Sequence, residues 1–194
     1  MTVTTYGIHL VISGGTSAQE PARYVSNHAS DRFGGGNLGT EFEGRGGNDT
    51  IFARGGDDIL NGGTGRDVLS GGTGADAFVF DTRLGRSNVD RITDFSSRQG
   101  DKLVLDNAAF KGLKPVVEDF RETGIDLGID GAGGLAKEAF RLGKAAQDAD
   151  DRVIYDRSTG ALYFDRDGTG ATAAVKFAQL KAGAKLVWSD FLVC

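Results

Sequence analysis

The sequence has little cysteine, little proline and no long apolar run. Its one cysteine, Cys194, cannot form an internal disulfide, and it is either a terminal residue without a role or a thiol used for dimerisation. No apolar stretch approaches the roughly 18 residues that span a bilayer, so no transmembrane segment is expected. The start, MTVTTYGIHLVISGG, lacks the basic region and the continuous apolar region of a secretory signal peptide.

Basic residues are also outnumbered. The chain has 22 Lys and Arg against 27 Asp and Glu, a net charge of -5 and a pI near 5.0. Binding to phosphate polymers depends on Lys and Arg that release counterions, so we expect no nucleic-acid partner. Of the 27 acidic residues, 21 are Asp, the short carboxylate that suits turns and hard cations.

Glycine, in contrast, is abundant and clustered. The chain has 31 glycines, and 15 of them fall within the 41 positions from Gly34 to Gly74. They do not recur at every third position, which excludes a collagen helix.

The glycine-rich segment repeats every nine residues. Asp49, Asp58, Asp67 and Asp76 are nine apart, and an apolar residue follows each by two positions: Ile51, Leu60, Leu69 and Phe78. Two degenerate units precede them, in which Asp31 comes before Phe33 and Thr40 before Phe42. Nine residues at about 100° each would place successive apolar residues on opposite faces of a helix, and a flexible linker would not keep this register. The pattern therefore predicts a solenoid of short strands and glycine turns.

The repeat resembles the repeats-in-toxin (RTX) family of haemolysin-type calcium-binding proteins. Residues 62–69 and 71–78, GGTGRDVL and GGTGADAF, match its pattern G-G-x-G-x-D-x-U-x in full, whereas earlier units depart from it at Arg45, Ala53 and Arg54. The resemblance implies a mainly β fold: a short parallel β-roll, a β-helix solenoid of nonapeptide repeats, followed by an α+β, largely β, C-terminal capping domain. It also implies several Ca²⁺ ions, each held between turns that lie two repeat units apart in the sequence.

Carried over position by position, the resemblance implies the following ligand sets. A first site takes carbonyls of Arg45, Gly47, Gly62 and Thr64 with the carboxylates of Asp49 and Asp67. A second takes carbonyls of Arg54, Gly56, Gly71 and Thr73 with Asp58 and Asp76. A third, on a degenerate repeat, takes Asn27, Ala29, Asp31, Gly44, Gly46 and Asp49. Where a further site would pair residue 40 with Asp58, Thr40 replaces the aspartate. Asp94 and Asp101 either complete a last site with Gly72, Gly74 and Asp76 or are turn carboxylates.

The narrow apolar core of such a roll cannot offset the entropy of ordering its backbone, about 1 to 2 kcal/mol per residue. We therefore expect the segment to be disordered without calcium and folded with it. Extracellular calcium modules work at about 10⁻⁴ to 10⁻³ M.

Beyond residue 80 ordinary globular patterning begins. We expect strands within 89–95 and 101–106, helices at 113–123 and 133–148, and two or three antiparallel strands over 152–180 with turns at 157–160 and 165–170. Residues 165–170, DRDGTG, resemble the start of an EF-hand loop, but Phe177 stands at the twelfth position, so a turn is preferred. We divide the chain into an N-terminal capping segment (1–30) whose strand covers the first coil, the β-roll (31–80) and a C-terminal flanking domain (81–194).

The C-terminal half resembles the flanking domain of secreted RTX proteins, and its SDFLV ending resembles the uncleaved signal of type I secretion. These resemblances imply a secreted, extracellular or surface-associated protein of a Gram-negative bacterium, with calcium and the type I secretion apparatus as partners. Two alternatives stay open: a calcium-dependent matrix, surface-layer or adhesive protein that binds itself or a cell-surface polysaccharide, and the C-terminal module of a larger secreted hydrolase.

No catalytic centre is expected in this sequence. The histidines, His9 and His28, lie in no HExxH motif, and no GxSxG elbow or Walker loop is present. Only about 30 residues precede the repeats, too few for a catalytic domain.

Overall fold

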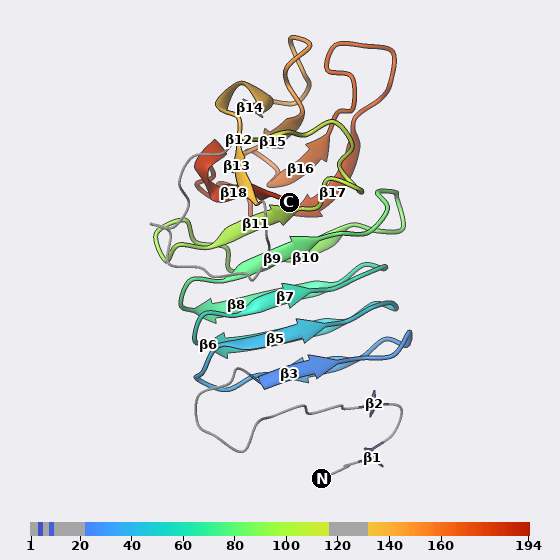
Figure 1. Cartoon of the computed structure of the whole chain (residues 1–194), viewed down its shortest axis with the longest axis vertical. Helices are drawn as coiled ribbons and strands as arrows, with labels where there is room; N and C mark the ends of the chain where they lie inside the picture. The colour runs from blue at the N-terminus through green and yellow to red at the C-terminus, as the bar shows by residue number, and fades with distance from the viewer. Residues whose placement is uncertain (1–3, 6–7, 10–21, 117–131) are drawn as a thin grey trace.

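The computed structural model describes residues 4–5, 8–9, 22–116 and 132–194 of the chain. Two eight-stranded sheets run along the long axis of the molecule and enclose the core (Figure 1). Among the described residues, no helix is long and apolar enough to cross a membrane.

From β3 to β11 the strands alternate between the two sheets. Sheet I contains, in spatial order, β12 (Pro115–Val116), β13 (Gly133–Leu135), β18 (Phe191–Val193), β11 (Lys102–Leu105), β9 (Ala77–Phe80), β7 (Ile59–Asn61), β5 (Thr40–Glu43) and β3 (Ala22–Val25). Sheet II contains β14 (Phe140–Leu142), β15 (Val153–Asp156), β16 (Ala161–Phe164), β17 (Val175–Gln179), β10 (Asp90–Ile92), β8 (Val68–Thr73), β6 (Thr50–Gly55) and β4 (Arg32–Gly34).

The strands of the repeat segment pair in parallel with an offset of two repeat units. Arg32 pairs with Thr50, and Thr50 pairs with Val68. One coil therefore contains two nine-residue units, one strand in each sheet. This register confirms the predicted parallel β-roll.

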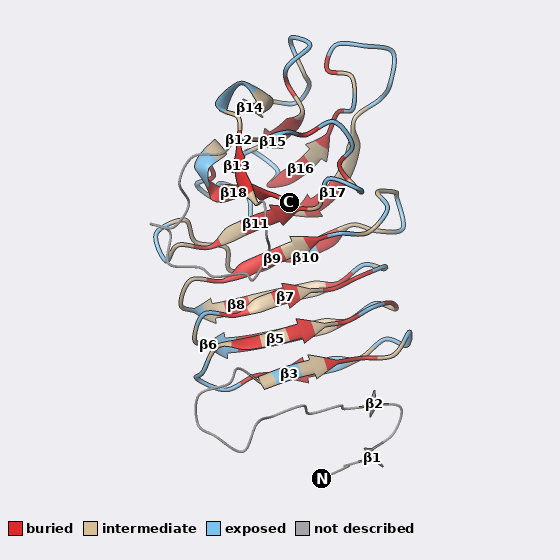
Figure 2. Ribbon diagram, in the orientation of Figure 1, coloured by how far each residue is buried: buried red, intermediate tan, exposed pale blue. Residues whose placement is uncertain are grey.

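One apolar residue from each unit points between the sheets. The six predicted inward residues are all at most 4% exposed: Phe33, Phe42, Ile51, Leu60, Leu69 and Phe78. The same core continues into the C-terminal half, where Phe110 packs edge-on against Phe164 and Phe177, with ring centroids 5.2 and 5.0 Å apart. Figure 2 shows buried residues in strands of the repeat segment and in strands of the C-terminal half.

The C-terminal strands extend both sheets of the roll. β10 pairs in parallel with β8, and β11 with β9, at the positions expected for strands. β15, β16 and β17 form the predicted antiparallel strands, with a turn over residues 157–160. β18 lies between β11 and β13.

The helix predicted at 133–148 is wrong. β13 pairs with β18, and β14 pairs with β15, so the apolar residues Leu135 and Phe140 belong to two different sheets. Only a short 3-10 helix, η2 (Lys137–Ala139), lies between them. Pairing with distant strands overrides local helix propensity in this segment.

The segment 113–123, for which a helix is predicted, contains the strand β12 instead in its described part. Its residues beyond 116 lie outside the described part. At the N-terminus, β1 (Thr4–Thr5) and β2 (Ile8–His9) pair only with each other among the described residues. The remainder of the predicted capping segment before residue 22 lies outside the described part as well.

Candidate calcium centre

The turns on one side of the roll are joined by aspartates. The backbone N–H of Asp31 donates to Asp49 Oδ1 at 2.7 Å, and that of Asp49 donates to Asp67 Oδ1 at 2.7 Å. The N–H of Asp67 donates in the same way to Asp90 Oδ1 at 3.1 Å. We call Asp31, Asp49, Asp67 and Asp90 the first aspartate column.

A second aspartate column, Asp58, Asp76 and Asp101, follows the same rule on the turns that lead into sheet I. The N–H of Asp58 donates to Asp76 Oδ1 at 3.1 Å, and that of Asp76 donates to Asp101 Oδ1 at 3.2 Å. Every aspartate after the first of its column thus uses one carboxylate oxygen to hold the turn before it in the column.

The other carboxylate oxygen has no protein partner. Asp49, Asp58, Asp67 and Asp76 are each at most 1% exposed, yet their Oδ2 atoms accept no hydrogen bond. Leaving a buried charged oxygen unpaired costs several kcal/mol. Four such atoms in register on consecutive turns are the arrangement expected where a cation binds.

A glycine at the first turn position lets a carboxylate oxygen and a backbone carbonyl lie close together. The Cβ point of Gly44, where a Cβ would lie, is 2.4 Å from both Asp49 Oδ2 and the carbonyl oxygen of Gly62, which is too close for any side chain. Carboxylate and carbonyl oxygens are the ligands that Ca²⁺ takes. Similar points beside Gly62 and Gly71 lie 2.3 Å from Asp67 Oδ2 and 2.1 Å from Asp76 Oδ2. Glycine at these positions leaves room that a side chain would fill.

The fourth position of each repeat turn requires glycine for a second reason. Gly47, Gly56, Gly65 and Gly74 have φ between 98° and 142°, outside the left-handed region open to other residues. At the second position φ is lower, 64° for Arg45 and 80° for Arg54, which non-glycine residues can adopt at a cost. The departures from the repeat pattern therefore fall where the backbone tolerates them.

The structure brings the residues of the first two predicted sites together across turns that are two repeat units apart. The carbonyl of Arg45 accepts the N–H of Thr64 at 2.9 Å, and the carbonyl of Thr73 accepts the N–H of Gly56 at 3.0 Å. The carbonyl oxygens of Gly47, Arg54 and Gly56 lie within 2.2 Å of the Cβ points of Gly65, Gly72 and Gly74, respectively.

The third predicted site is built differently. Asp31 is only partly buried, and its Oδ2 is paired with the hydroxyl of Ser26. Asn27 accepts the N–H of Ala29, whose carbonyl contacts Gly47, and Gly46 lies next to His28. Asp31 therefore lacks the buried Oδ2 atom without a partner that Asp49 and Asp67 have.

Thr40 does not extend the second aspartate column. Its hydroxyl donates to the carbonyl of Leu38 in its own turn. Gly36 and Leu38, at the second and fourth turn positions, lack the positive φ of the other turns. This turn therefore has a different backbone from the turns that carry aspartate.

At the last predicted site the two carboxylates have different surroundings. Asp94 accepts the N–H groups of Gly71 and Gly72 at 3.1 and 3.0 Å and the Ser70 hydroxyl at 2.6 Å. Asp101 joins the second aspartate column, and its Oδ2 accepts the N–H of Ser96 at 2.8 Å. The side chain of Gln99 bridges the carbonyl of Gly72 and the N–H of Gly74.

Asp90 was missed in the sequence because its distance from Asp67 is not a multiple of the nine-residue period. A usable signal was present, since Asp90 precedes Ile92 by two positions, as Asp101 precedes Leu103 and as each repeat aspartate precedes its core residue. Asp90 is 4% exposed, in line with the repeat aspartates.

The aspartates titrate abnormally without a bound cation. Burial raises the pKa of Asp49, Asp58 and Asp76 from 3.8 to about 7, and repulsion from the next aspartate of the column adds to it. Burial likewise raises the pKa of Asp67 and Asp90. Two carboxylates together with backbone carbonyls are a ligand set that suits calcium. In the described part, no three His, Cys, Asp or Glu side chains are placed to hold a metal ion by themselves.

These pKa values predict that the calcium-free chain is more stable at pH 5 than at pH 8. Between about 4 and 7 the folded chain holds more protons than the unfolded chain, so stability falls as pH rises. Circular dichroism of metal-stripped protein should show more β structure at pH 5. Saturating calcium should remove this gain, and a calcium-free chain that becomes more stable as pH rises would contradict the assignment.

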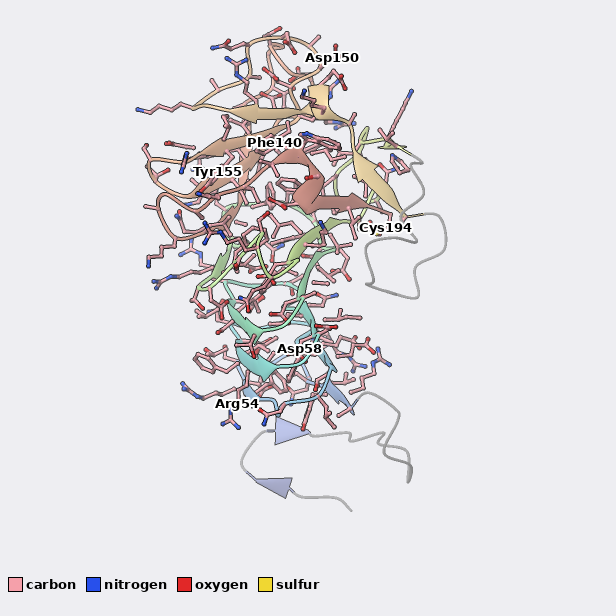
Figure 3. All side chains as sticks on the ribbon, turned by 90° about the vertical axis from the view of Figure 1, so that its left-hand side faces the viewer. Arg54, Asp58, Phe140, Asp150, Tyr155 and Cys194 are labelled. Atoms are coloured by element: carbon pink, nitrogen blue, oxygen red, sulfur yellow. The ribbon has the colours of Figure 1, made fainter. Side chains whose placement is uncertain are left out.

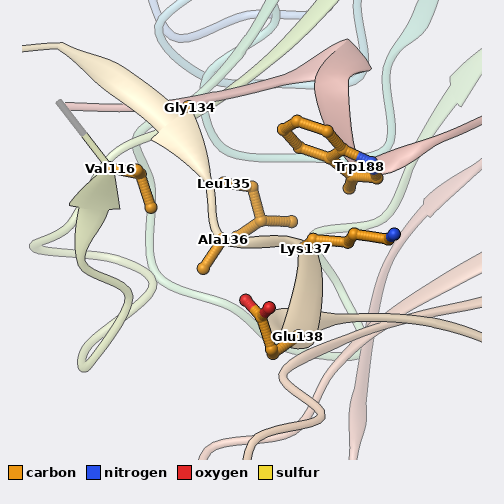
Figure 4. A pocket seen from close by; sticks show the side chains of 7 residues that line it. All are labelled: Val116, Gly134, Leu135, Ala136, Lys137, Glu138 and Trp188. Atoms are coloured by element: carbon orange, nitrogen blue, oxygen red, sulfur yellow. The ribbon is translucent and has the colours of Figure 1, made fainter. Parts of the chain in front are cut away.

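A separate hollow lies on the C-terminal strands, away from the repeat turns. Figure 4 shows its lining: Val116, Gly134, Leu135, Ala136, Lys137, Glu138 and Trp188. Its walls are mostly apolar, with one lysine and one glutamate.

Comparison with known proteins agrees with the repeat geometry. Residues 42–78 match the family described as the RTX calcium-binding nonapeptide repeat, in four copies, so this segment consists of calcium-binding RTX repeats. No curated protein matches the chain significantly.

Two solved structures are similar, both subunits of a mannuronan C5-epimerase from Azotobacter vinelandii. The AlgE6R3 subunit is 25% identical with a TM-score of 0.48, over 93% of this chain and 83% of that one. The AlgE6R2 subunit is 22% identical with a TM-score of 0.49, over 91% of this chain and 94% of that one.

Proposed function

We propose that this chain is a secreted protein whose β-roll folds when calcium binds outside the cell. The observation that carries the proposal is that Asp49, Asp58, Asp67 and Asp76 are buried and that each has at least one carboxylate oxygen without a protein partner. Without a cation, these aspartates oppose folding through desolvation and mutual repulsion. Bound calcium would neutralise this charge and supply the missing ligand.

The residues that would hold the ions follow from the two aspartate columns. In the first, the carbonyls of residues 45, 47, 62 and 64 would complete the site with Asp49 and Asp67; in the second, the carbonyls of residues 54, 56, 71 and 73 would do so with Asp58 and Asp76. Because Asp49, Asp67 and Asp76 also accept an N–H from the turn two repeat units earlier, occupying one site fixes the turn on which the next is built. Binding of successive ions should therefore be cooperative.

Secretion by the type I route is part of the proposal. A chain that stays unfolded at cytosolic calcium can pass through an exporter, and folding at about 10⁻⁴ to 10⁻³ M calcium outside would make return unfavourable. The acidic residue followed by apolar ones at Asp190–Val193 supports this route. The proposed role is not catalytic.

A calcium titration of metal-stripped protein, followed by circular dichroism, tests the proposal. We expect a coil-to-β transition near millimolar calcium and none with magnesium, which prefers a tighter octahedral site. A spectrum that chelation does not change, together with no bound calcium, would overturn it. Light scattering in the same titration distinguishes the two possibilities: a constant particle size indicates a monomer, and a size that grows with calcium indicates a calcium-dependent matrix protein.

A further inference from the structure

The repeat turns contact one another through the peptide groups of their third position. In the first column, the N–H of Thr64 donates to the second-position carbonyl of Arg45, two repeat units earlier, at 2.9 Å. In the second column, the carbonyl of Thr73 accepts the fourth-position N–H of Gly56 at 3.0 Å. A turn is thus held by a donor and an acceptor that belong to the turn two repeat units later.

The last repeat turn of the first column, residues 62–67, meets side chains instead of a further repeat turn. Its second-position carbonyl, on Gly63, accepts the hydroxyl of Thr82 at 3.0 Å. Its fourth-position N–H, on Gly65, donates to Asn88 Oδ1 at 2.7 Å. Asn88 Nδ2 donates to Thr82 Oγ1 at 2.8 Å, so the two side chains act together. We call Thr82 and Asn88 the first end cap.

The second column ends in the same way. The carbonyl of Gly72 accepts Gln99 Nε2 at 3.2 Å, and the N–H of Gly74 donates to Gln99 Oε1 at 3.4 Å. We call Gln99 the second end cap. In both columns, side chains from beyond the repeats supply the donor and the acceptor that the peptide group of a further turn would supply.

The first end cap binds the last turn at positions that alternate with the proposed calcium ligands. The carbonyls of Gly62 and Thr64 are the proposed ligands, whereas the cap contacts the carbonyl of Gly63 and the N–H of Gly65. Because each peptide group is planar, fixing these two groups limits the rotation of the carbonyls beside them. The cap can therefore orient the ligands without touching the ion.

The first end cap is itself held in place. The N–H of Asn88 donates to the carbonyl of Gly85 at 3.0 Å, and Asn88 Nδ2 also donates to the carbonyl of Arg83 at 3.1 Å. Thr82 and Asn88 are both partly buried. Side chains that are already ordered lose little conformational freedom when a ligand binds, which favours binding.

We propose that the two end caps are positioning residues for calcium. The first serves the site between Asp49 and Asp67, and the second serves the site between Asp58 and Asp76. Each holds the last repeat turn of its column in the shape that the ion requires, through backbone groups alone. The inference rests on the proposed function, since it concerns a roll that folds with calcium, and it assigns a part in that folding to side chains outside the repeats.

A double-mutant cycle on the full chain tests the proposal, with the calcium midpoint of folding measured by circular dichroism. Asn88→Ala should raise the midpoint at least about threefold, as expected for loss of a hydrogen bond to a partly buried N–H. In an Asp49→Asn background, which weakens the same site, the further increase should be less than about 1.5-fold, because the two changes are coupled. In an Asp58→Asn background, at the residue labelled in Figure 3, the full effect should remain, since Asp58 belongs to the other column.

Two further variants complete the experiment. Asn107→Ala is the matched control, because it removes the same amide from an exposed residue after β11, and its midpoint should stay within about 1.5-fold of wild type. Thr82→Val keeps the size of the side chain and removes the donor to the carbonyl of Gly63. It should raise the midpoint with the same dependence on the column, and it serves in place of Asn88→Ala if that variant does not fold.

Equal shifts by the cap variant in the two aspartate backgrounds would overturn the proposal, because the cap would then stabilise the fold without acting on one site. A cap variant with the midpoint of Asn107→Ala would overturn it as well. Both results leave a wild-type chain that folds with calcium. A wild-type chain that does not respond to calcium would instead overturn the proposed function, and this inference with it.

Discussion

Asp58→Asn should raise the calcium concentration at which the roll folds by at least about tenfold, equivalent to about 1.4 kcal/mol. The substitution keeps the size of the side chain but removes a buried charge whose two oxygens have no protein partner. In the proposed site, Asp58 and Asp76 are the only charged ligands, so half of the charge that attracts the ion is lost. The midpoint of a calcium titration followed by circular dichroism measures the effect.

Asp57→Asn is the matched control. It makes the same chemical change one residue earlier, where the Asp57 side chain is exposed and its Oδ1 accepts the N–H of Ala75 at 2.7 Å. In the neighbouring turn Asn48 already fills this position and accepts the N–H of Arg66 at 2.8 Å. We expect the calcium midpoint of D57N to stay within about twofold of wild type, since an exposed charge contributes little. Equal shifts in both variants would mean that net charge, not ligation, controls folding.

Gly65→Ala should destabilise the calcium-loaded roll by about 2 kcal/mol or more. Gly65 has a φ of 142°, and its Cβ would lie 1.6 Å from the carbonyl oxygen of Gly47, a proposed calcium ligand. Substitution of glycine by alanine gains about 0.4 to 1 kcal/mol through the unfolded chain, too little to compensate. Thermal unfolding at fixed calcium should show the loss.

Gly36→Ala provides the comparison. Gly36 lies in the repeat turn that ends at Thr40, has no positive φ, and has no atom within 4 Å of its Cβ point. This variant should unfold at the wild-type temperature or slightly above it. If G65A were as stable as G36A, the close contact between Gly65 and the carbonyl of Gly47 would not be needed for the folded state.

The repeat segment was predictable because its structure is local. A nine-residue period fixes the strand, the turn and the inward residue of each unit, so Phe42, Ile51 and Leu60 could be placed in the core from spacing alone. Two units per coil then give the parallel register that β6 and β8 show.

Beyond the repeats the sequence is less informative, because pairing is no longer between neighbours. Leu135 and Leu142 are seven residues apart, which is a helical spacing, yet their strands β13 and β14 pair with β18 and β15, respectively, and neither partner is implied by local composition. Asp90 was missed for a related reason: an insertion before it breaks the period while the column of hydrogen bonds continues.

The place of β18 in sheet I determines the order in which this fold can be completed. Leu103 pairs with Phe191, far along the chain, and β13 joins the sheet only through β18. Coils of the roll can be added one upon another through short loops, whereas this last pairing must close a long one, and closure of long loops slows folding. Refolding should therefore show two kinetic phases, a rapid formation of the coils and a slower pairing of β18 with β11. Until β18 is in place, β12 and β13 have no strand of sheet I with which to pair.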